Sequence, residues 1–296
     1  MDDLTELYGL IDDFYKAFEA QLKAHLLADG KRHRSHQGRL SLPELMTLVV
    51  LFHPIGYRQF KRFYLNPVCG YLRAEFPRLP TYQRCVERMP RGRVAWAAWV
   101  DPLTGKCSGV SMADPPLAVC DHLRIARPRV FRGMAARGKS STGWFFGFKW
   151  HRVIHHRGEL LCVSLTPCKV DDRQPLRQFA QRLFGKRYAD KGYIAKWLTD
   201  FLKNAGIEWV TQIKKNMKPV LRDPFDQAML RQRSLVETVI DELKNLYQVA
   251  HSRPRSPFNF AVNLLAGLVA YGLMPNKPRQ PLQDVRLLQK TQFMPN

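Results

Sequence analysis

The sequence predicts an α/β protein in which an all-helical domain precedes a mixed β-sheet flanked by helices. Two observations lead to this fold class. Up to about residue 105 apolar residues recur at helical spacing, whereas strand-like and helix-like segments alternate from Cys107 onward. Apolar residues make up 45% of the 296 residues, which is enough for a sizeable core and argues against global disorder.

The first 105 residues are expected to form a helical N-terminal domain. Residues 2–28 fit an amphipathic helix, because their apolar side chains recur with a period near 3.6. Ser41 and Glu44 have the spacing of a capping box, which predicts that a second helix begins there and ends near Pro54. Further helices are expected over residues 56–65 and 82–99.

Strands and helices are expected to alternate after residue 105. The expected strands cover residues 107–113, 144–154, 160–166, 187–189 and 208–213, the second and third forming a hairpin. The expected helices cover residues 172–183, 194–204, 225–247 and 259–273. A hairpin followed by βα alternation predicts a mixed sheet over residues 106–274, in which the first and fourth strands can be neighbours. The proline-containing tail, residues 275–296, is expected to be loosely ordered.

The charge of the chain points to a polyanionic partner. Lys and Arg number 47 against 25 Asp and Glu, which gives a net charge of +22 and a pI of about 10.1. Such an excess is typical of proteins that bind nucleic acid. The six cysteines form no C-x-x-C pair, and nothing at the N-terminus resembles a signal peptide. We therefore expect reduced thiols and a cytoplasmic, nucleoid-associated protein with no membrane partner.

Three acidic residues stand out against this basic background. Asp114 ends the apolar run 110–113, Asp190 ends the expected strand 187–189, and Glu237 lies on an expected helix. If the first and fourth strands are neighbours, Asp114 and Asp190 face each other at one edge of the sheet. A like-charged pair there needs a bound cation or a shared proton. Three convergent carboxylates in a basic protein indicate Mg²⁺ held against a phosphodiester.

Each acidic residue also has a simpler interpretation. Asp114 alone can cap a strand end, Asp190 alone can belong to a turn, and Glu237 can pair with Arg233 one helical turn away. Among the basic residues, Lys214 and Lys215 follow an expected strand and fit either phosphate contacts or a solvated loop. Possible DNA contacts of the helical domain, which are equally consistent with a solvated surface, are His33, Arg34, His36, Arg58, Lys61 and Arg62.

Four segments together resemble a DDE transposase of bacterial insertion sequences, in the insertion-sequence family numbered 982. They are Gly109–Asp114, Trp144–Lys149, Tyr188–Tyr193 and Arg231–Thr238. The resemblance runs from Met1 to about Lys277, and its most specific parts are the A-D-K-G-Y block and the R-x₃-E-x₆-K spacing. The chain departs from the family pattern at Leu230, where the signature has tyrosine, at Cys168-Lys169 in place of Gly-Asn, and at Pro115-Pro116.

The resemblance implies an RNase H-like catalytic domain in which Asp114, Asp190 and Glu237 hold two divalent ions, Mg²⁺ or Mn²⁺ in its place. It also implies that Arg233 and Lys244 belong to the transposase signature. The residues assigned to DNA contacts are Arg233, Lys244, Lys191, Lys149, Lys214 and Lys215. The expected function is metal-dependent strand cleavage and strand transfer of an insertion sequence, by a homodimer on double-stranded DNA at the element ends and the target. Two alternatives stay open: a catalytically inactive DNA-binding remnant, and a metal-dependent nuclease that cuts without joining.

Overall fold

A computed structural model describes residues 4–28, 38–119, 131–140, 143–218, 220–231, 233–249, 254 and 256–279. The chain divides into two compact units. The helical unit comprises Met1–Leu103 and Leu243–Pro275, and the sheet unit comprises Thr104–Glu242 and Asn276–Asn296. The expected boundary near residue 105 agrees with this division. The expected domain 106–274 does not, because the segment from Leu243 onward packs with the N-terminal helices.

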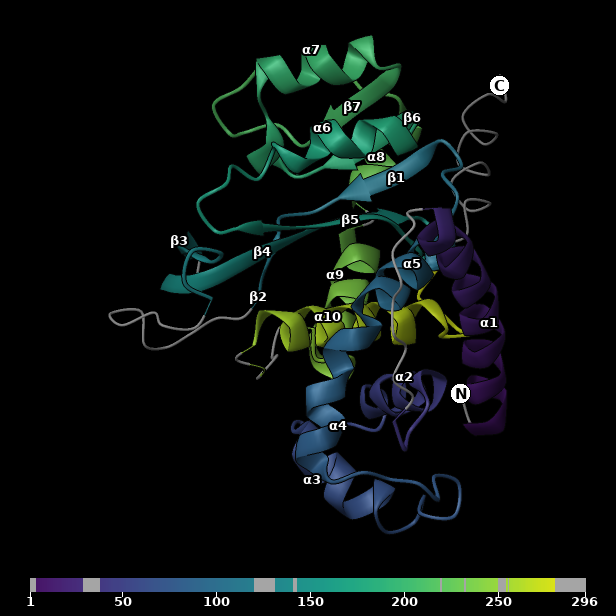
Figure 1. Cartoon of the computed structure of the whole chain (residues 1–296). Coiled ribbons are helices and arrows are strands. Elements are labelled where there is room, and N and C mark those ends of the chain that lie inside the picture. Colours follow the sequence, from purple (N-terminus) through teal and green to yellow (C-terminus); the bar gives the residue numbers. More distant parts are fainter. Residues whose placement is uncertain are drawn as a thin grey trace. The chain divides into compact units, whose positions relative to one another are not determined.

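The helical unit consists of the long helix α1 (Leu4–Ala28) at one edge and several shorter helices (Figure 1). Its elements are α1 (Leu4–Ala28), α2 (Leu42–Phe52), α3 (Phe60–Phe63), the π-helical η1 (Tyr64–Val68), α4 (Tyr82–Arg88), the 3₁₀ turn η2 (Met89–Gly92), α5 (Arg93–Leu103) and α10 (Pro257–Gly272). The predicted capping box is present: Glu44 N–H donates to Ser41 Oγ over 3.2 Å, and Glu44 Oε2 accepts from Ser41 N–H.

Two sequence-based boundaries of the helical unit are wrong. The helix expected over 56–65 begins only at Phe60 and continues as the π-helical η1. The helix expected over 82–99 is interrupted by η2, where Pro90 supplies no N–H for helical hydrogen bonding. The apolar helix α10 packs on α5 and α2, which is why it belongs to this unit.

A seven-stranded mixed sheet forms the centre of the sheet unit. Its strands are β1 (Val110–Ala113), β2 (Leu117–Val119), β3 (Ala136–Ser140), β4 (Gly143–His155), β5 (Leu160–Pro167), β6 (Gly185–Ala189) and β7 (Ile207–Thr211). The long strand β4 pairs antiparallel with β1, β2, β3 and β5, whereas β1, β6 and β7 are parallel to one another in register. The predicted hairpin and the predicted contact between the first and fourth strands are thus confirmed.

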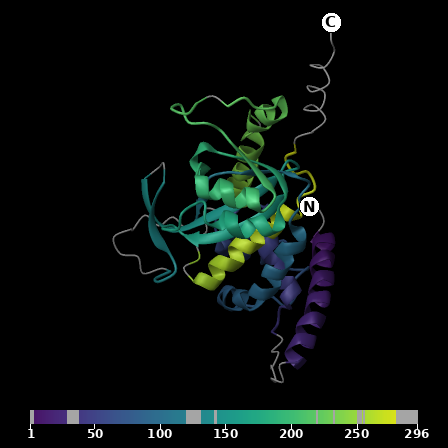
Figure 2. The ribbon, with the colours of Figure 1, turned by 90° about the horizontal axis from the view of Figure 1, so that it is seen from above.

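Helices cover both faces of this sheet, which Figure 2 shows from above. The helices are α6 (Pro175–Phe179), η3 (Ala180–Arg182), η4 (Lys191–Tyr193), α7 (Lys196–Asn204), α8 (Pro224–Arg231) and α9 (Arg233–Asp241). Leu176 of α6 and Leu198 of α7 pack in one core cluster with Ala189 of β6. Tyr188 bonds to Asp226 of α8. Because successive side chains of a strand point to opposite faces, α8 lies on the face opposite to α6 and α7.

The long helix expected over residues 225–247 is described as α8 and α9 on either side of residue 232, which lies outside the described residues, and it continues as the π-helical η5 (Glu242–Leu246) after Asp241. No glycine or proline lies within residues 225–247, so the local pattern does not predict the π-helical turn. The side chains of α8 are anchored on the sheet, as described below.

Some residues named in the sequence analysis lie outside those that the structure describes. These residues are His33, Arg34, His36, Cys120 and the tail from residue 280 onward. The five described cysteines are free thiols, as predicted. Among the described helices, none combines the length and apolar character needed to span a bilayer.

Candidate active site at the ends of two parallel strands

The ends of β1 and β6 bring Asp114 and Asp190 next to each other. The two strands are parallel, with Ala113 opposite Ala189, so the residue that follows each strand emerges at the same edge. Both aspartates line one small hollow of about 20 Å³. The other lining residues are Met112, Ala113, Tyr188, Ala189, Met229, Leu230 and Val236. The sheet register therefore produces the predicted pair of carboxylates.

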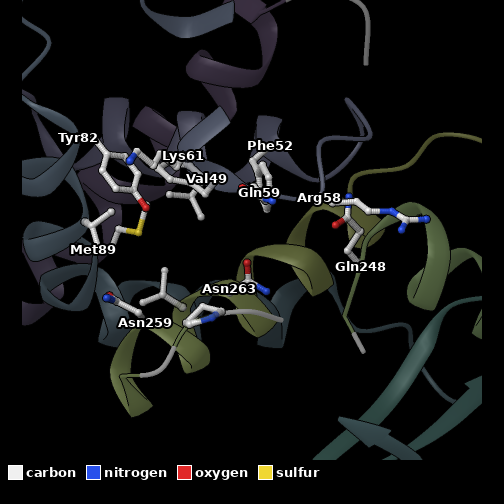
Figure 3. Close-up of a pocket in the computed structure, with 14 residues that line it drawn as sticks. Val49, Phe52, Arg58, Gln59, Lys61, Tyr82, Met89, Gln248, Asn259 and Asn263 are labelled. Carbon is white, nitrogen blue, oxygen red and sulfur yellow. The ribbon is translucent and has the colours of Figure 1, made fainter. Parts of the chain in front are cut away.

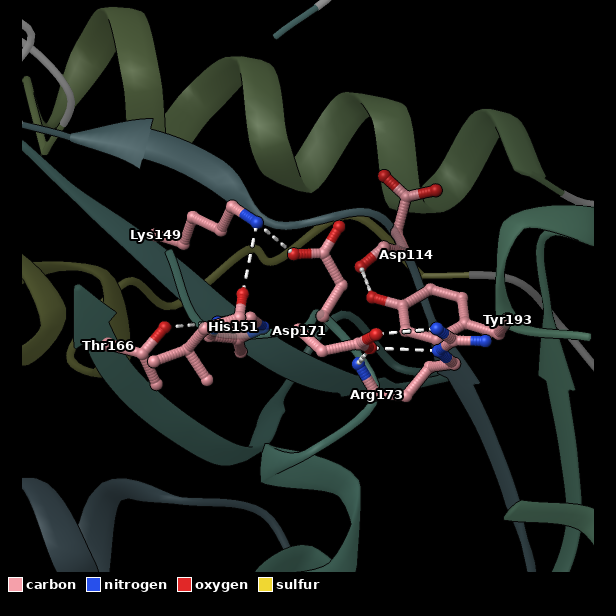
Figure 4. A network of polar contacts seen from close by, with 9 residues as sticks. Asp114, Lys149, His151, Thr166, Asp171, Arg173 and Tyr193 are labelled. Carbon is pink, nitrogen blue, oxygen red and sulfur yellow. Dashed lines mark hydrogen bonds and ion pairs between the residues drawn. The ribbon is translucent and has the colours of Figure 1, made fainter. Parts of the chain in front are cut away.

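Two side chains of the sheet unit hold Asp114 in place. The hydroxyl of Tyr193 donates to the backbone oxygen of Asp114 over 2.8 Å, and Figure 4 shows the carboxylate pointing away from the tyrosine ring. Nη2 of Arg152 lies 3.5 Å from Oδ2 of Asp114. Arg152 is only 2% exposed, and its guanidinium lies 5.3 Å from the ring centroid of Trp150. The backbone and the carboxylate of Asp114 are thus fixed from two directions.

Burial shifts the pKa values of both supporting groups. It lowers the pKa of Arg152 to about 10, an effect that the charge of Asp114 opposes, so the guanidinium still carries its charge at neutral pH. Burial also raises the pKa of Tyr193, and the negative charges of Asp172, Asp114 and Asp190 raise it further. Tyr193 therefore stays protonated and remains a hydrogen-bond donor near these carboxylates.

The floor of the hollow is positioned by α8. Asp226 is buried in the first turn of α8 and accepts hydrogen bonds from Tyr188 Oη at 2.7 Å and from Lys186 Nζ at 2.9 Å. A buried carboxylate that is satisfied by a cation and a phenol fixes the position of the helix on β6. One turn later, Leu230 is 8% exposed and lines the hollow. Leu230 is therefore a packing residue of the sheet unit.

The third expected ligand, Glu237, is exposed on α9, directly after the hollow-lining Val236. Within the described ranges, no group of three or more His, Cys, Asp or Glu side chains is arranged to hold a metal ion. The structure brings Asp114 and Asp190 together and does not add Glu237 to them. Arg233 begins α9, and its side chain is outside the described part of the chain.

The predicted DNA-contacting lysines fall into two groups. Lys149 is used inside the sheet unit, because its Nζ donates to Asp172 Oδ1 at 2.6 Å and to the Val170 oxygen at 3.1 Å (Figure 4). The predicted DNA contact of Lys149 stays a prediction. The other lysines, Lys191, Lys214, Lys215 and Lys244, have exposed side chains, the last one in the helical unit.

Sequence reasoning missed Arg152 and Tyr193 as parts of the site. A signal for Arg152 exists: it is a charged residue inside a strand in which Trp150, His151, Val153 and Ile154 are all buried. A charge in such a strand needs a partner, and that partner is Asp114. Tyr193 lies within the A-D-K-G-Y block, but the sequence does not show that its hydroxyl reaches back to β1.

The donor set fits a hard divalent cation. Carboxylate oxygens are the ligands that Mg²⁺ prefers, and the hollow beside Asp114 and Asp190 is about the volume that holds one water-sized particle. The buried Arg152 neutralises part of the charge of Asp114 when no cation is bound.

Comparison with known proteins adds one family match. The family model described as "Transposase DDE domain" matches residues 104–257, more than half of the chain. No curated protein matches. Among solved structures, the "Crystal structure of a pre-cleavage Mos1 transpososome" is similar at 11% sequence identity, over 95% of this chain and 100% of that chain, with a TM-score of 0.21.

Proposed function

We propose, because the chain belongs to the transposase DDE domain family, that it is a metal-dependent transposase that cleaves DNA strands and joins them to a target. The observation that carries this proposal is the pair of carboxylates at the ends of β1 and β6, which line the same hollow. We further propose that the fold of the sheet unit is RNase H-like, since β5, β4, β1, β6 and β7 lie side by side with the last three parallel.

In this proposal Asp114 and Asp190 hold a divalent ion, and Glu237 on α9 completes the ligand set. When bound, Mg²⁺ or Mn²⁺ supplies Lewis-acid activation of an attacking oxygen and stabilises charge on the phosphodiester. Arg152 orients the carboxylate of Asp114, and Tyr193 fixes the backbone next to it. Exposed Lys191, Lys214 and Lys215 bind phosphates of the substrate strand.

The finer assignments rest on sequence motifs and charge. The A-D-K-G-Y block at residues 189–193 and the R-x₃-E-x₆-K spacing support membership in the insertion-sequence family numbered 982. The net charge of +22 supports double-stranded DNA as the partner. We propose a homodimer on DNA, with the helical unit recognising the element ends. Inverted repeats of that family flanking the coding region would support the family assignment.

The first prediction tests the carboxylates. Asp114→Asn, Asp190→Asn and Glu237→Gln should each abolish cleavage and leave DNA binding intact, since each removes a charged ligand and little volume. The measurement is cleavage of an element-end duplex beside a binding titration, with the exposed Asp200→Asn of α7 as the matched control. Near-normal cleavage by Glu237→Gln, together with loss in Glu242→Gln, would move the third role to Glu242.

The alternative functions separate on a paired-end substrate. A transposase yields strand-transfer products, a nuclease yields cut ends only, and an inactive remnant binds the duplex and yields neither. The same assay therefore decides among the three.

A further inference from the structure

The helical unit contains a cavity of about 360 Å³, which is within the size range of small-ligand sites. It lies among α2, α3, α4 and α10 and is lined by fourteen residues, most of them drawn and labelled in Figure 3. Its walls combine apolar side chains with four amides and two cations, and the described part of the lining contains neither Asp nor Glu. The cavity thus offers an apolar interior, hydrogen-bonding groups and a positive potential.

The amides come partly from an otherwise apolar helix. Nearly all of the buried side chains of α10 are apolar, yet Asn259 and Asn263 lie four residues apart, on the face that lines the cavity. Figure 3 shows the amide of Asn263 directed into the space. Oδ1 of Asn259 is buried and has no hydrogen-bond partner among the described residues. An unpaired buried amide oxygen is unfavourable unless a ligand or water completes it.

Aromatic and cationic side chains form the opposite wall. Phe52 and Phe60 pack edge to face, with ring centroids 5.4 Å apart, and Tyr82 lies beside Phe60. The ammonium of Lys61 is 6.0 Å from the centre of the Tyr82 ring. Arg58 and Lys61 are both exposed. A planar, polar-edged ring can therefore lie against the aromatic side chains while an attached anion meets the two cations.

We propose that this cavity binds one unstacked nucleotide of a DNA strand, with the base inside and its phosphate at Arg58 and Lys61. Aromatic side chains and a basic rim are the groups that bind single-stranded nucleic acid, and asparagine and glutamine amides pair with base edges. The inference deepens the proposed function, on which it rests for the identity of the polymer. According to this inference, the helical unit binds an extruded or single-stranded nucleotide at the DNA end, in addition to double-stranded DNA.

The experiment measures whether binding depends on the base. The full-length chain, without divalent metal, is titrated with a fluorescein-labelled oligothymidylate, with an oligoadenylate, and with a strand of abasic sites that keeps the phosphates. The wild type should bind at least one base-bearing strand about tenfold or more tightly than the abasic strand, the scale expected from stacking of one base. Asn263→Leu, which keeps volume and removes the amide, should abolish most of that difference.

A matched pair of cations tests the rim. Lys61 and Arg62 are adjacent and exposed in α3, and only Lys61 lines the cavity. Lys61→Gln should weaken binding of the base-bearing strand severalfold more than Arg62→Gln does. Thermal unfolding of each variant establishes that it is folded.

Three outcomes overturn the inference: equal affinity for abasic and base-bearing strands, an undiminished base preference in Asn263→Leu, or equal losses in Lys61→Gln and Arg62→Gln. These failures are distinct from failure of the proposed function. Metal-dependent strand transfer without base preference would leave the transposase assignment intact and remove only the cavity's role. Base preference without any cleavage would support the role of the cavity and contradict the transposase assignment.

Discussion

The two units bury polar side chains in different ways. In the helical unit the buried polar residues are uncharged and bonded to backbone: Thr47 donates to the Pro43 oxygen at 2.9 Å, His53 Nδ1 lies 2.6 Å from the Tyr247 oxygen, and Gln248 donates to the Tyr57 oxygen at 2.9 Å. The sheet unit buries charges, namely Arg152, Arg187 and Asp226. Burial of a charge costs far more free energy than burial of a neutral group that keeps its hydrogen bond.

This difference between the units follows from the polar groups that each unit contains. The sheet unit places two carboxylates side by side at strand ends, and a buried cation next to them reduces their repulsion. The helical unit has no such pair in its described part, and its polar side chains surround a cavity instead. In our proposals the buried charge of Arg152 supports the site of chemistry, whereas the amides of the helical unit line a site of recognition.

The largest predicted effect is a loss of stability in acid that is steeper for the sheet unit. Burial lowers the pKa of His53 in the helical unit and of His151 in the sheet unit from 6.5 to about 4. Above pH 6.5 both histidines are neutral in the folded and in the unfolded chain. As the pH falls from 6.5 to 4, each histidine is protonated in the unfolded chain before it is protonated in the folded chain. The free energy of unfolding therefore falls, on the order of 3 kcal/mol per histidine.

The sheet unit also buries His155 and His156, whose pKa values are lowered by burial as well. Hydrogen exchange at pH 7 and pH 4.5 should therefore show a larger loss of protection in β4 than in α2. His151→Gln should reduce the pH dependence of hydrogen-exchange protection in the sheet unit, and His53→Gln should reduce it in the helical unit. Equal losses in both units would contradict the comparison.

The next prediction concerns Arg187, which has no exposed surface. Its three guanidinium nitrogens have no hydrogen-bond partner among the described residues, and burial lowers its pKa to about 10. Arg187→Met should raise the free energy of unfolding by about 1–4 kcal/mol, because a buried cation is replaced by an apolar chain of similar size. Denaturant titration measures this, with the exposed Arg157→Met as control. A destabilised Arg187→Met would show that the cation has a stabilising partner, such as the nearby thiol of Cys162.

The sequence was informative wherever the signal is local or follows from topology. The capping box at Ser41 and Glu44 requires only a three-residue spacing. The pairing of β1 with β6 follows from a hairpin and one βα connection, and it was enough to bring Asp114 and Asp190 together. These features depend on residues close in sequence or on few possible topologies.

The rest depends on tertiary packing, which periodicity does not report. The apolar stripe of α10 is compatible with either unit, and only its contacts with α5 and α2 assign it to the helical one. The hydrogen bond from Tyr188 to Asp226 of α8 joins residues that are far apart in the sequence, so the periodicity of the helix does not report it.

The next prediction concerns the packing of Leu230 in α8. Leu230 is buried beside Met112 and Tyr188, so Leu230→Tyr should destabilise the sheet unit by about 1–3 kcal/mol through overpacking. Leu221 is fully exposed, and Leu221→Tyr should leave the unfolding midpoint unchanged. An unchanged midpoint in Leu230→Tyr would place the Leu230 side chain at the surface.

The last and smallest effect separates the two buried arginines of the sheet unit by function. Arg152→Met removes the cation beside Asp114 and keeps most of the packing on Trp150. Loss of such a supporting group should reduce cleavage and divalent-metal affinity about 10–100-fold, which corresponds to about 1.4–2.7 kcal/mol. Metal affinity is measured by calorimetry and cleavage on the element-end duplex.

Arg187→Met is the internal control for that experiment, because it removes a buried cation on the same sheet whose guanidinium nitrogens have no hydrogen-bond partner among the described residues. It should leave both metal affinity and cleavage near the wild-type values. If Arg152→Met also leaves metal affinity unchanged, the ion pair with Asp114 is only structural. Charge burial in the sheet unit would then say nothing about its chemistry, and the contrast with the helical unit would reduce to a difference in packing.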